Sequence, residues 1–198
     1  MLLKNEGIYY YDTRLQLIGY EVLSHNPRVI TNQEKDFINF KIMLTKLKLV
    51  NKNGLIYHVN LMPSTLEKYH KQVIDVINKL KLNNKVVIEI VEGQSQEIER
   101  VIKKVNRNGI KLSIDDFGTG YSNVDRIVNA LKHIDSIKVD RVVWKNTQEI
   151  LKALVEIADK KGIKLIAEKV ETQKELNKLL DLGVRYFQGW YFRENTKV

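Results

Sequence analysis

Short apolar runs alternate with longer amphipathic segments along most of the chain. The first two runs, Ile8–Tyr11 and Leu17–Leu23, are joined by residues 12–16 only, and so short a link requires the two strands to be antiparallel. Further on, each run of strand length precedes a segment with helical spacing. The pattern predicts further strands at about 55–60, 86–91, 110–115, 135–139, 163–168 and 184–188. It predicts helices at Gln33–Val50, Thr65–Lys81, Ser95–Asn108, Asn123–Leu131, Gln148–Lys161 and Thr172–Leu182.

This order of elements predicts the fold class. Alternating strands and helices are typical of α/β proteins with a parallel sheet, and eight strands favour a closed barrel. The 198 residues fit one domain spanning 1–198. We therefore expect a modified TIM (β/α)8 barrel with an antiparallel first strand. Because the chain ends ten residues after Gln188, we also expect a truncated C-terminal end with little room for a final helix.

The segment from Asp115 to Ser122 carries the clearest chemistry. Asp115 and Asp116 follow the apolar run 110–114, and Gly118 and Gly120 then permit a tight loop. Adjacent carboxylates repel each other, so a cation between them is the natural partner. A bridging aspartate that binds two divalent ions fits this arrangement, and a solvated turn is the plainer alternative.

Polar side chains also follow the other predicted strands, and the active sites of barrels lie at the carboxyl ends of their strands. We therefore expect one shared site. Its candidates are Glu21, Asn60, Glu89 with Glu92, Asp115 with Asp116, Lys138, Glu168 with Glu171, and Gln188.

Composition narrows the surroundings of such a site. The chain has no cysteine, which excludes disulfides and thiolate metal ligands, and it has no apolar run long enough to cross a membrane. With no signal-peptide core at the start, we expect a cytoplasmic protein that is not bound to membranes. The net charge of +9 comes from lysines scattered along predicted helix faces. Without a nucleic-acid-binding motif, we expect no direct contact with nucleic acid.

In these motifs the chain resembles the EAL-domain family of cyclic di-GMP phosphodiesterases. The resemblance runs from Tyr20 to Phe192 and rests on ordered motifs, not on one short match. The motifs are Glu21-Val22-Leu23, Val59-Asn60-Leu61-Met62-Pro63, Glu89-Ile90-Val91-Glu92, Asp115 to Ser122, Lys138-Val139-Asp140, Ala167-Glu168-Lys169-Val170-Glu171-Thr172 and Gln188-Gly189-Trp190.

The resemblance implies metal-dependent cleavage of one phosphodiester of cyclic di-GMP to linear pGpG, with two Mg²⁺ or Mn²⁺ ions. Glu21, Asn60, Glu89 and Asp115 would hold one ion. Asp115 and Asp116 would hold the other, with Glu168 as ligand or base. Catalysis would further involve Lys138, near the attacking water, and Glu171 as support. Glu92 would anchor the Asp-Phe-Gly-Thr-Gly loop, and Gln188 and Leu23 would line the substrate.

Some positions depart from the family pattern. His25 stands where an arginine that contacts phosphate is usual, and Arg28 is a possible substitute. Lys169 replaces a glycine, Met62 replaces a serine, and the Gln-Pro-Ile motif of the first strand is absent. The missing arginine, the missing Gln-Pro-Ile motif and the trimmed ends motivate the alternative to an active enzyme, a weak or inactive member that binds cyclic di-GMP or a regulatory protein partner. The resemblance also implies a homodimer formed through the helix at 123–131.

Overall fold

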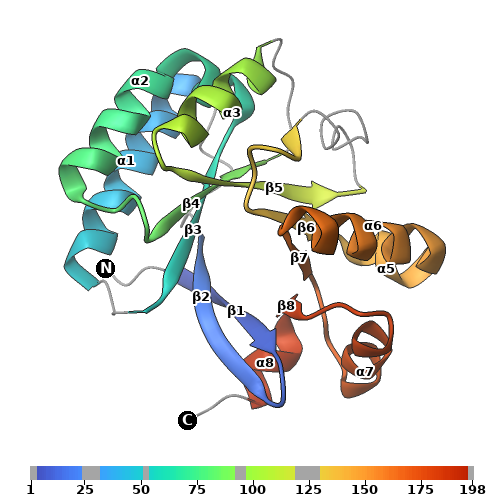
Figure 1. Ribbon diagram of the computed structural model, residues 1–198. Helices are drawn as coiled ribbons and strands as arrows, with labels where there is room; N and C mark the ends of the chain where they lie inside the picture. Colours follow the sequence, from blue (N-terminus) through green and yellow to red (C-terminus); the bar gives the residue numbers. More distant parts are fainter. Residues whose placement is uncertain (1–3, 24–31, 51–53, 92–96, 119–129, 196–198) are drawn as a thin grey trace.

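Eight strands close into one barrel, in the order in which they occur in the sequence (Figure 1). The computed structural model describes residues 4–23, 32–50, 54–91, 97–118 and 130–195. The strands are β1 (Lys4–Tyr11), β2 (Leu15–Leu23), β3 (Ile56–Leu61), β4 (Val86–Ile90), β5 (Lys111–Phe117), β6 (Ser136–Val139), β7 (Lys164–Ala167) and β8 (Tyr186–Gln188). The predicted fold class is confirmed.

The first strand closes the barrel and runs antiparallel to both of its neighbours. β1 pairs antiparallel with β2, where Glu6 faces Glu21, and antiparallel with β8, where Ile8 faces Gln188. All other neighbouring strands are parallel. The short link after β1 therefore predicted the direction correctly. As a result, the carboxyl ends of β2 to β8 point to one end of the barrel.

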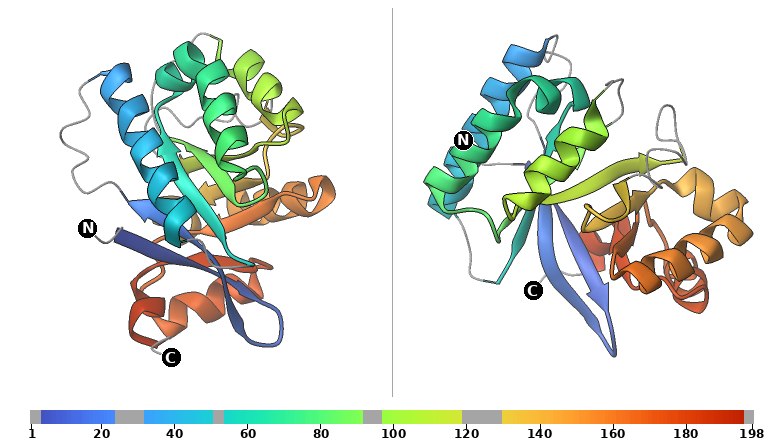
Figure 2. Two further views of the ribbon diagram at one scale, coloured as in Figure 1. Left: turned by 90° about the vertical axis from the view of Figure 1, so that its left-hand side faces the viewer. Right: turned by 45° about the horizontal axis from the view of Figure 1, so that its top comes forward.

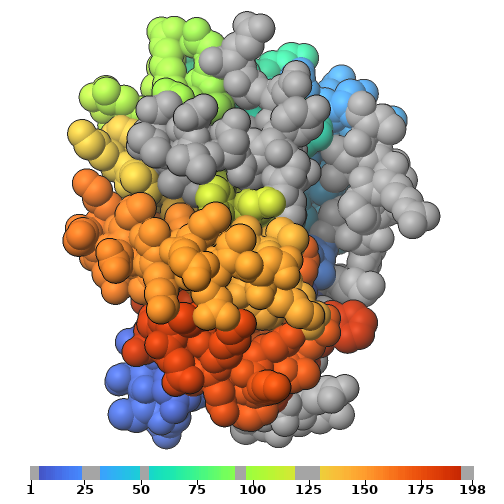
Figure 3. All heavy atoms as spheres, turned by 90° about the vertical axis from the view of Figure 1, so that its right-hand side faces the viewer, coloured from blue at the N-terminus to red at the C-terminus, as the bar shows by residue number. Residues whose placement is uncertain are grey.

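Helices cover the outside of the strands in two groups (Figures 1 and 2). The first three, packed side by side against β3 to β5, are α1 (Gln33–Val50), α2 (Pro63–Leu80) and α3 (Ile98–Arg107). The second group contains α5 (Arg141–Asn146), α6 (Gln148–Lys161) and α7 (Gln173–Asp181). These helices form one continuous face, with the tip of the β1–β2 hairpin beside it (Figure 3). A short helix, α8 (Trp190–Asn195), follows β8.

Two of these helices were not predicted. α5 begins immediately after β6, where the side chain of Asp140 accepts a hydrogen bond from the Val142 N–H at 2.7 Å and caps the helix. α8 follows Gln188 directly, so the expectation of little room for a final helix was wrong: six residues suffice for a short one. Residues 123–129 of the helix predicted at 123–131, to which the dimer contact was assigned, lie outside the described residues.

The hydrophobic core lies between the strands and the helices. Phe40 and Leu44 of α1, Ile77 of α2 and Ile102 of α3 are fully buried against the strands. At the carboxyl ends of β2 to β8, the interior of the barrel contains polar residues instead. These residues occupy the inward-pointing positions, which alternate along each strand. No helix among the described residues combines the length and apolar character that crossing a membrane requires.

Candidate functional site

Polar side chains from seven consecutive strand ends converge inside the barrel. All but one are buried, and Asn60 is half-buried. Each lies at or near the carboxyl end of its strand, where inward positions of neighbouring parallel strands meet. The set comprises Glu21, Asn60, Glu89, Asp115, Lys138, Glu168 and Gln188.

Lys138 lies at the centre of this cluster. Its ammonium is 2.8 Å from Glu168 Oε1, 3.0 Å from both Glu21 Oε2 and Asp115 Oδ1, and 3.2 Å from Glu89 Oε1. Burial alone would lower the pKa of Lys138, but the four carboxylates raise it well above its ordinary value. One fixed positive charge therefore faces four acidic groups.

Glu21 accepts hydrogen bonds from two side-chain amides. Asn60 Nδ2 donates to its Oε1 at 3.0 Å, and Gln188 Nε2 donates to its Oε2 at 2.6 Å. Burial acts to raise the pKa of Glu21, yet Lys138 and these two amides outweigh it and lower the pKa to about 2. Glu21 is therefore a carboxylate whose negative charge is held in place.

The other three acids have the opposite tendency. Burial raises the pKa of Glu89 and of Asp115, although Lys138 opposes both shifts. Burial and the charge of Asp115 raise the pKa of Glu168 to about 8, again against the effect of Lys138. A single lysine does not neutralise this cluster, so it has room for further positive charge.

His58 is a member of the site that the sequence motifs did not reveal. Its Nδ1 is 2.8 Å from Glu89 Oε1, and both side chains are buried. Burial, followed by the charge of Lys138, lowers the pKa of His58 to about 3, so the ring is neutral and the contact is a hydrogen bond. His58 lies two positions before Asn60 on β3, with one residue between them, and this period-two spacing was the available signal.

Three carboxylates form the most metal-like group. Ligand oxygens of Asp115, Asp116 and Glu168 lie within 4.8 Å of one another. Among the described residues, Asn60 Oδ1, Glu168 Oε2 and Gln188 Oε1 are buried oxygens with no hydrogen-bond donor. Hard oxygen donors of this kind suit Mg²⁺ or Mn²⁺. The residues present therefore fit a divalent ion.

Asp116 differs from its neighbours in backbone and environment. Its φ of 49° is left-handed, and its side chain is 37% exposed. The ammonium of Lys169 contacts Asp116 Oδ1 at 3.4 Å and also contacts Asp140 Oδ2. The strand end thus turns Asp116 outward, toward a lysine that stands where the family pattern has glycine.

Other predicted residues have different surroundings. Glu171, predicted to support catalysis, has a side chain that is 49% exposed and lies 2.6 Å from Arg141. Leu23 is half-buried at the end of β2. His25, Arg28 and Glu92 lie outside the described residues.

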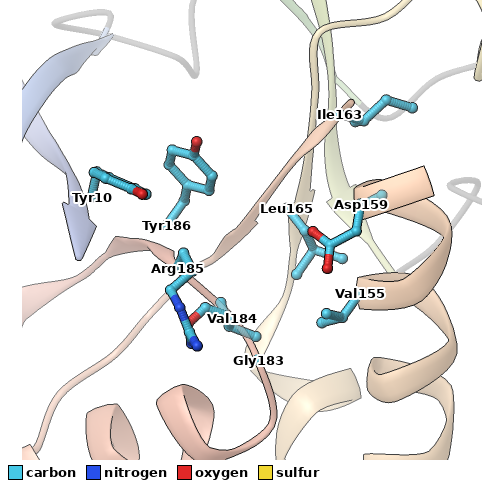
Figure 4. Close-up of a pocket in the computed structure, with 10 residues that line it drawn as sticks. Tyr10, Val155, Asp159, Ile163, Leu165, Gly183, Val184, Arg185 and Tyr186 are labelled. Carbon is cyan, nitrogen blue, oxygen red and sulfur yellow. The ribbon is translucent and has the colours of Figure 1, made fainter. Parts of the chain in front are cut away.

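A pocket of about 200 Å³ lies at the other end of the barrel (Figure 4). Ile163 and Leu165 at the start of β7 line it, and so does Tyr186 at the start of β8, whose ring is 5.0 Å from that of Tyr10. The acidic cluster lies at the opposite ends of the same strands. This cavity is therefore separate from the candidate site.

Comparisons with known proteins agree with the fold and the motifs. The family model of the EAL domain matches residues 34–195. A cyclic di-GMP phosphodiesterase, PdeA, of Borreliella burgdorferi is 32% identical over 181 residues, which cover 83% of this chain and 27% of that protein. A probable cyclic di-GMP phosphodiesterase of Escherichia coli K12, also named PdeA, is 33% identical over 153 residues, covering 71% of this chain and 21% of its own length. The chain thus spans about a quarter of these relatives.

Solved structures share the same barrel. BlrP1 of Klebsiella pneumoniae, in a complex with calcium and cyclic di-GMP, superposes with a TM-score of 0.80 at 24% identity, covering 96% of this chain and 54% of BlrP1. The Bacillus subtilis YkuI protein, with substrate cyclic di-GMP and calcium, has a TM-score of 0.77 at 20% identity and covers 95% of this chain and 54% of YkuI.

Proposed function

Because the chain belongs to the EAL-domain family, we propose that it hydrolyses one phosphodiester bond of cyclic di-GMP and releases linear pGpG. The observation that carries the proposal is the convergence of Asp115, Asp116 and Glu168 at the carboxyl ends of β5 and β7. Relatives with similar sequences carry the same activity in their names.

Two divalent ions, Mg²⁺ or Mn²⁺, are assigned to this end of the barrel. Glu21, Asn60, Glu89 and Asp115 would hold one ion. Asp115 and Asp116 would hold the second, with Glu168 as a further ligand or as the base. Bound ions would supply charge neutralisation at the phosphodiester and a lowered pKa of a coordinated water.

The protein's own groups then divide the remaining work. Lys138 contributes a fixed positive charge to a site that must accept an anionic phosphodiester. Gln188 and Asn60 orient Glu21 through their amide donors, and His58 orients Glu89. Glu168 Oε2, which meets no donor among the described residues, would accept a proton from the attacking water in this proposal.

The test is incubation of the purified protein with cyclic di-GMP in Mg²⁺, in Mn²⁺ and in chelator, with products separated by anion-exchange chromatography. We expect pGpG only when a divalent ion is present. Asp116→Asn is the matched variant, since asparagine tolerates the left-handed backbone at this position while removing the charge. It should lose turnover and keep its fold. Product formation in chelator, or full turnover by the variant, would contradict the proposal.

A second candidate is a regulator that binds cyclic di-GMP or a protein partner without turnover. The contact of Lys169 with Asp116 favours it, because this ammonium lies beside one of the proposed metal ligands. Calorimetry distinguishes the two: cyclic di-GMP that binds to the wild-type protein with metal and is recovered intact supports the regulator.

A further inference from the structure

Lys169 has a backbone conformation that glycine would adopt without strain. Its φ is 59°, in the left-handed region. The residues on both sides are fixed, because the Glu168 N–H donates to Val139 O at 3.1 Å and the Val170 N–H donates to Gln188 O at 3.1 Å. The chain therefore holds a long charged side chain at a strained and rigid position, a combination that indicates a role for that side chain.

The ammonium of Lys169 joins the edges of three strands. It contacts Asp140 Oδ2 beyond β6 and Asp116 Oδ1 on β5, at 3.4 Å. Asp140 is itself fixed, since its N–H donates to Phe117 O at 3.2 Å and its other carboxylate oxygen accepts from Val142 N at 2.7 Å. The ammonium of Lys169 therefore lies between two carboxylates, and lysine is a cation at neutral pH.

We propose that Lys169 is a tethered cation that competes with the second divalent ion at Asp116. The inference rests on the proposed function, because it concerns the ion that Asp115 and Asp116 would share. One ion then binds first, at Glu21, Asn60 and Glu89, away from this ammonium. The second binds against the repulsion of this ammonium, which its 54% exposure allows to move partly aside.

The size of the effect follows from electrostatics. A monovalent cation about 4 Å from a dication in water weakens the binding of that dication roughly tenfold or more. Salt screens the interaction, so the effect shrinks at high ionic strength. Mobility of the exposed side chain reduces it further, and we therefore expect about tenfold at low salt.

The experiment measures Mn²⁺ binding by calorimetry and by electron paramagnetic resonance in the whole chain. Lys169→Gly removes both the charge and the backbone strain, whereas Lys169→Met removes the charge only. The matched control is Lys81→Gly. Lys81 is an exposed lysine with a φ of 57° at the end of α2, outside the site, and its replacement gives the same change in net charge.

The wild-type protein and Lys81→Gly should show one tight and one weaker Mn²⁺ site. Both Lys169 variants should tighten the weaker site about tenfold and leave the tight one unchanged. Equal affinities in all four proteins would overturn the role of Lys169 while leaving the metal site standing. Tightening in Lys169→Gly alone would assign the effect to the backbone and also overturn it. Absence of Mn²⁺ binding from every protein would remove the proposed function itself.

Discussion

Replacing Lys138 by methionine removes the one cation at the centre of four buried acids. Methionine keeps the length of the side chain and leaves Glu21, Glu89, Asp115 and Glu168 without their common partner. Breaking a buried ion pair in this way costs about 3–5 kcal/mol. The shift in the pKa of Glu21 from 4.5 to about 2 corresponds by itself to about 3 kcal/mol.

The pH dependence separates this reasoning from a simple packing defect. In the wild-type protein the pKa of Glu21 is lowered, so its contribution is present above pH 4.5 and is lost as the pH falls toward 2. Without Lys138, burial raises the folded pKa of all four acids. Their contribution to stability is then present below the unfolded pKa and lost as the pH rises. The loss in free energy of unfolding caused by Lys138→Met should therefore be largest at neutral pH and smaller at about pH 4.5.

Urea unfolding followed by circular dichroism, in chelator at pH 4.5 and 7.5, measures this loss in free energy. The control is Lys164→Met at the other end of the barrel. Burial lowers the pKa of Lys164 and the charge of Lys111 lowers it further, so its loss should not destabilise the protein. The reasoning fails if Lys138→Met lies within about 1 kcal/mol of wild type at pH 7.5. It also fails if the loss in free energy is equal at both pH values, or if the variant is unfolded at both.

Three further substitutions test other parts of the structure. His58→Ala removes the neutral ring that orients the carboxylate of Glu89. We expect the free energy of unfolding in urea to fall by about 1–3 kcal/mol and the Mn²⁺ affinity to fall about 10- to 100-fold. Unchanged Mn²⁺ affinity would contradict that role. Gly189→Ala places a Cβ 2.2 Å from the backbone oxygen of Val170. It should lower the melting temperature far more than Gly162→Ala, because Gly162 has a φ of 67° but open space around it. Equal losses would refute the steric argument. Glu171→Gln should leave Mn²⁺ affinity within about twofold, since this exposed side chain pairs with Arg141; a larger loss would place it among the ligands.

The sequence predicted the frame of this protein because the frame depends on periodic patterns. The short link after β1 fixed its direction, and the apolar runs placed every strand near its observed position. Polar residues at strand ends identified most of the buried cluster, since parallel strands bring those ends together. Helix α5 was not predicted, because six residues are too few to show a helical period.

Contacts that depend on tertiary geometry were harder to predict from the sequence. His58 lies within an apolar run, two positions before Asn60, and this spacing predicts that it shares a face with Asn60 but not that it contacts Glu89. Lys169 reads as a departure from a glycine, but its reach to Asp116 and Asp140 depends on the left-handed backbone and on the spacing of three strands. Glu171 reads as a partner of Glu168 in the same motif, yet the turn after β7 directs it to Arg141.

The pairing of β1 with β8 sets the order in which the protein can be completed during synthesis. Ile8 meets Gln188 across the closing seam, and Gln188 also supplies an amide donor to Glu21. The ribosome makes the first partner of each contact long before the second, so neither barrel closure nor the amide hydrogen bond to Glu21 exists until residue 188 has emerged. Chains released earlier would lack the seam and this hydrogen bond together, and contacts this distant in sequence are expected to form slowly.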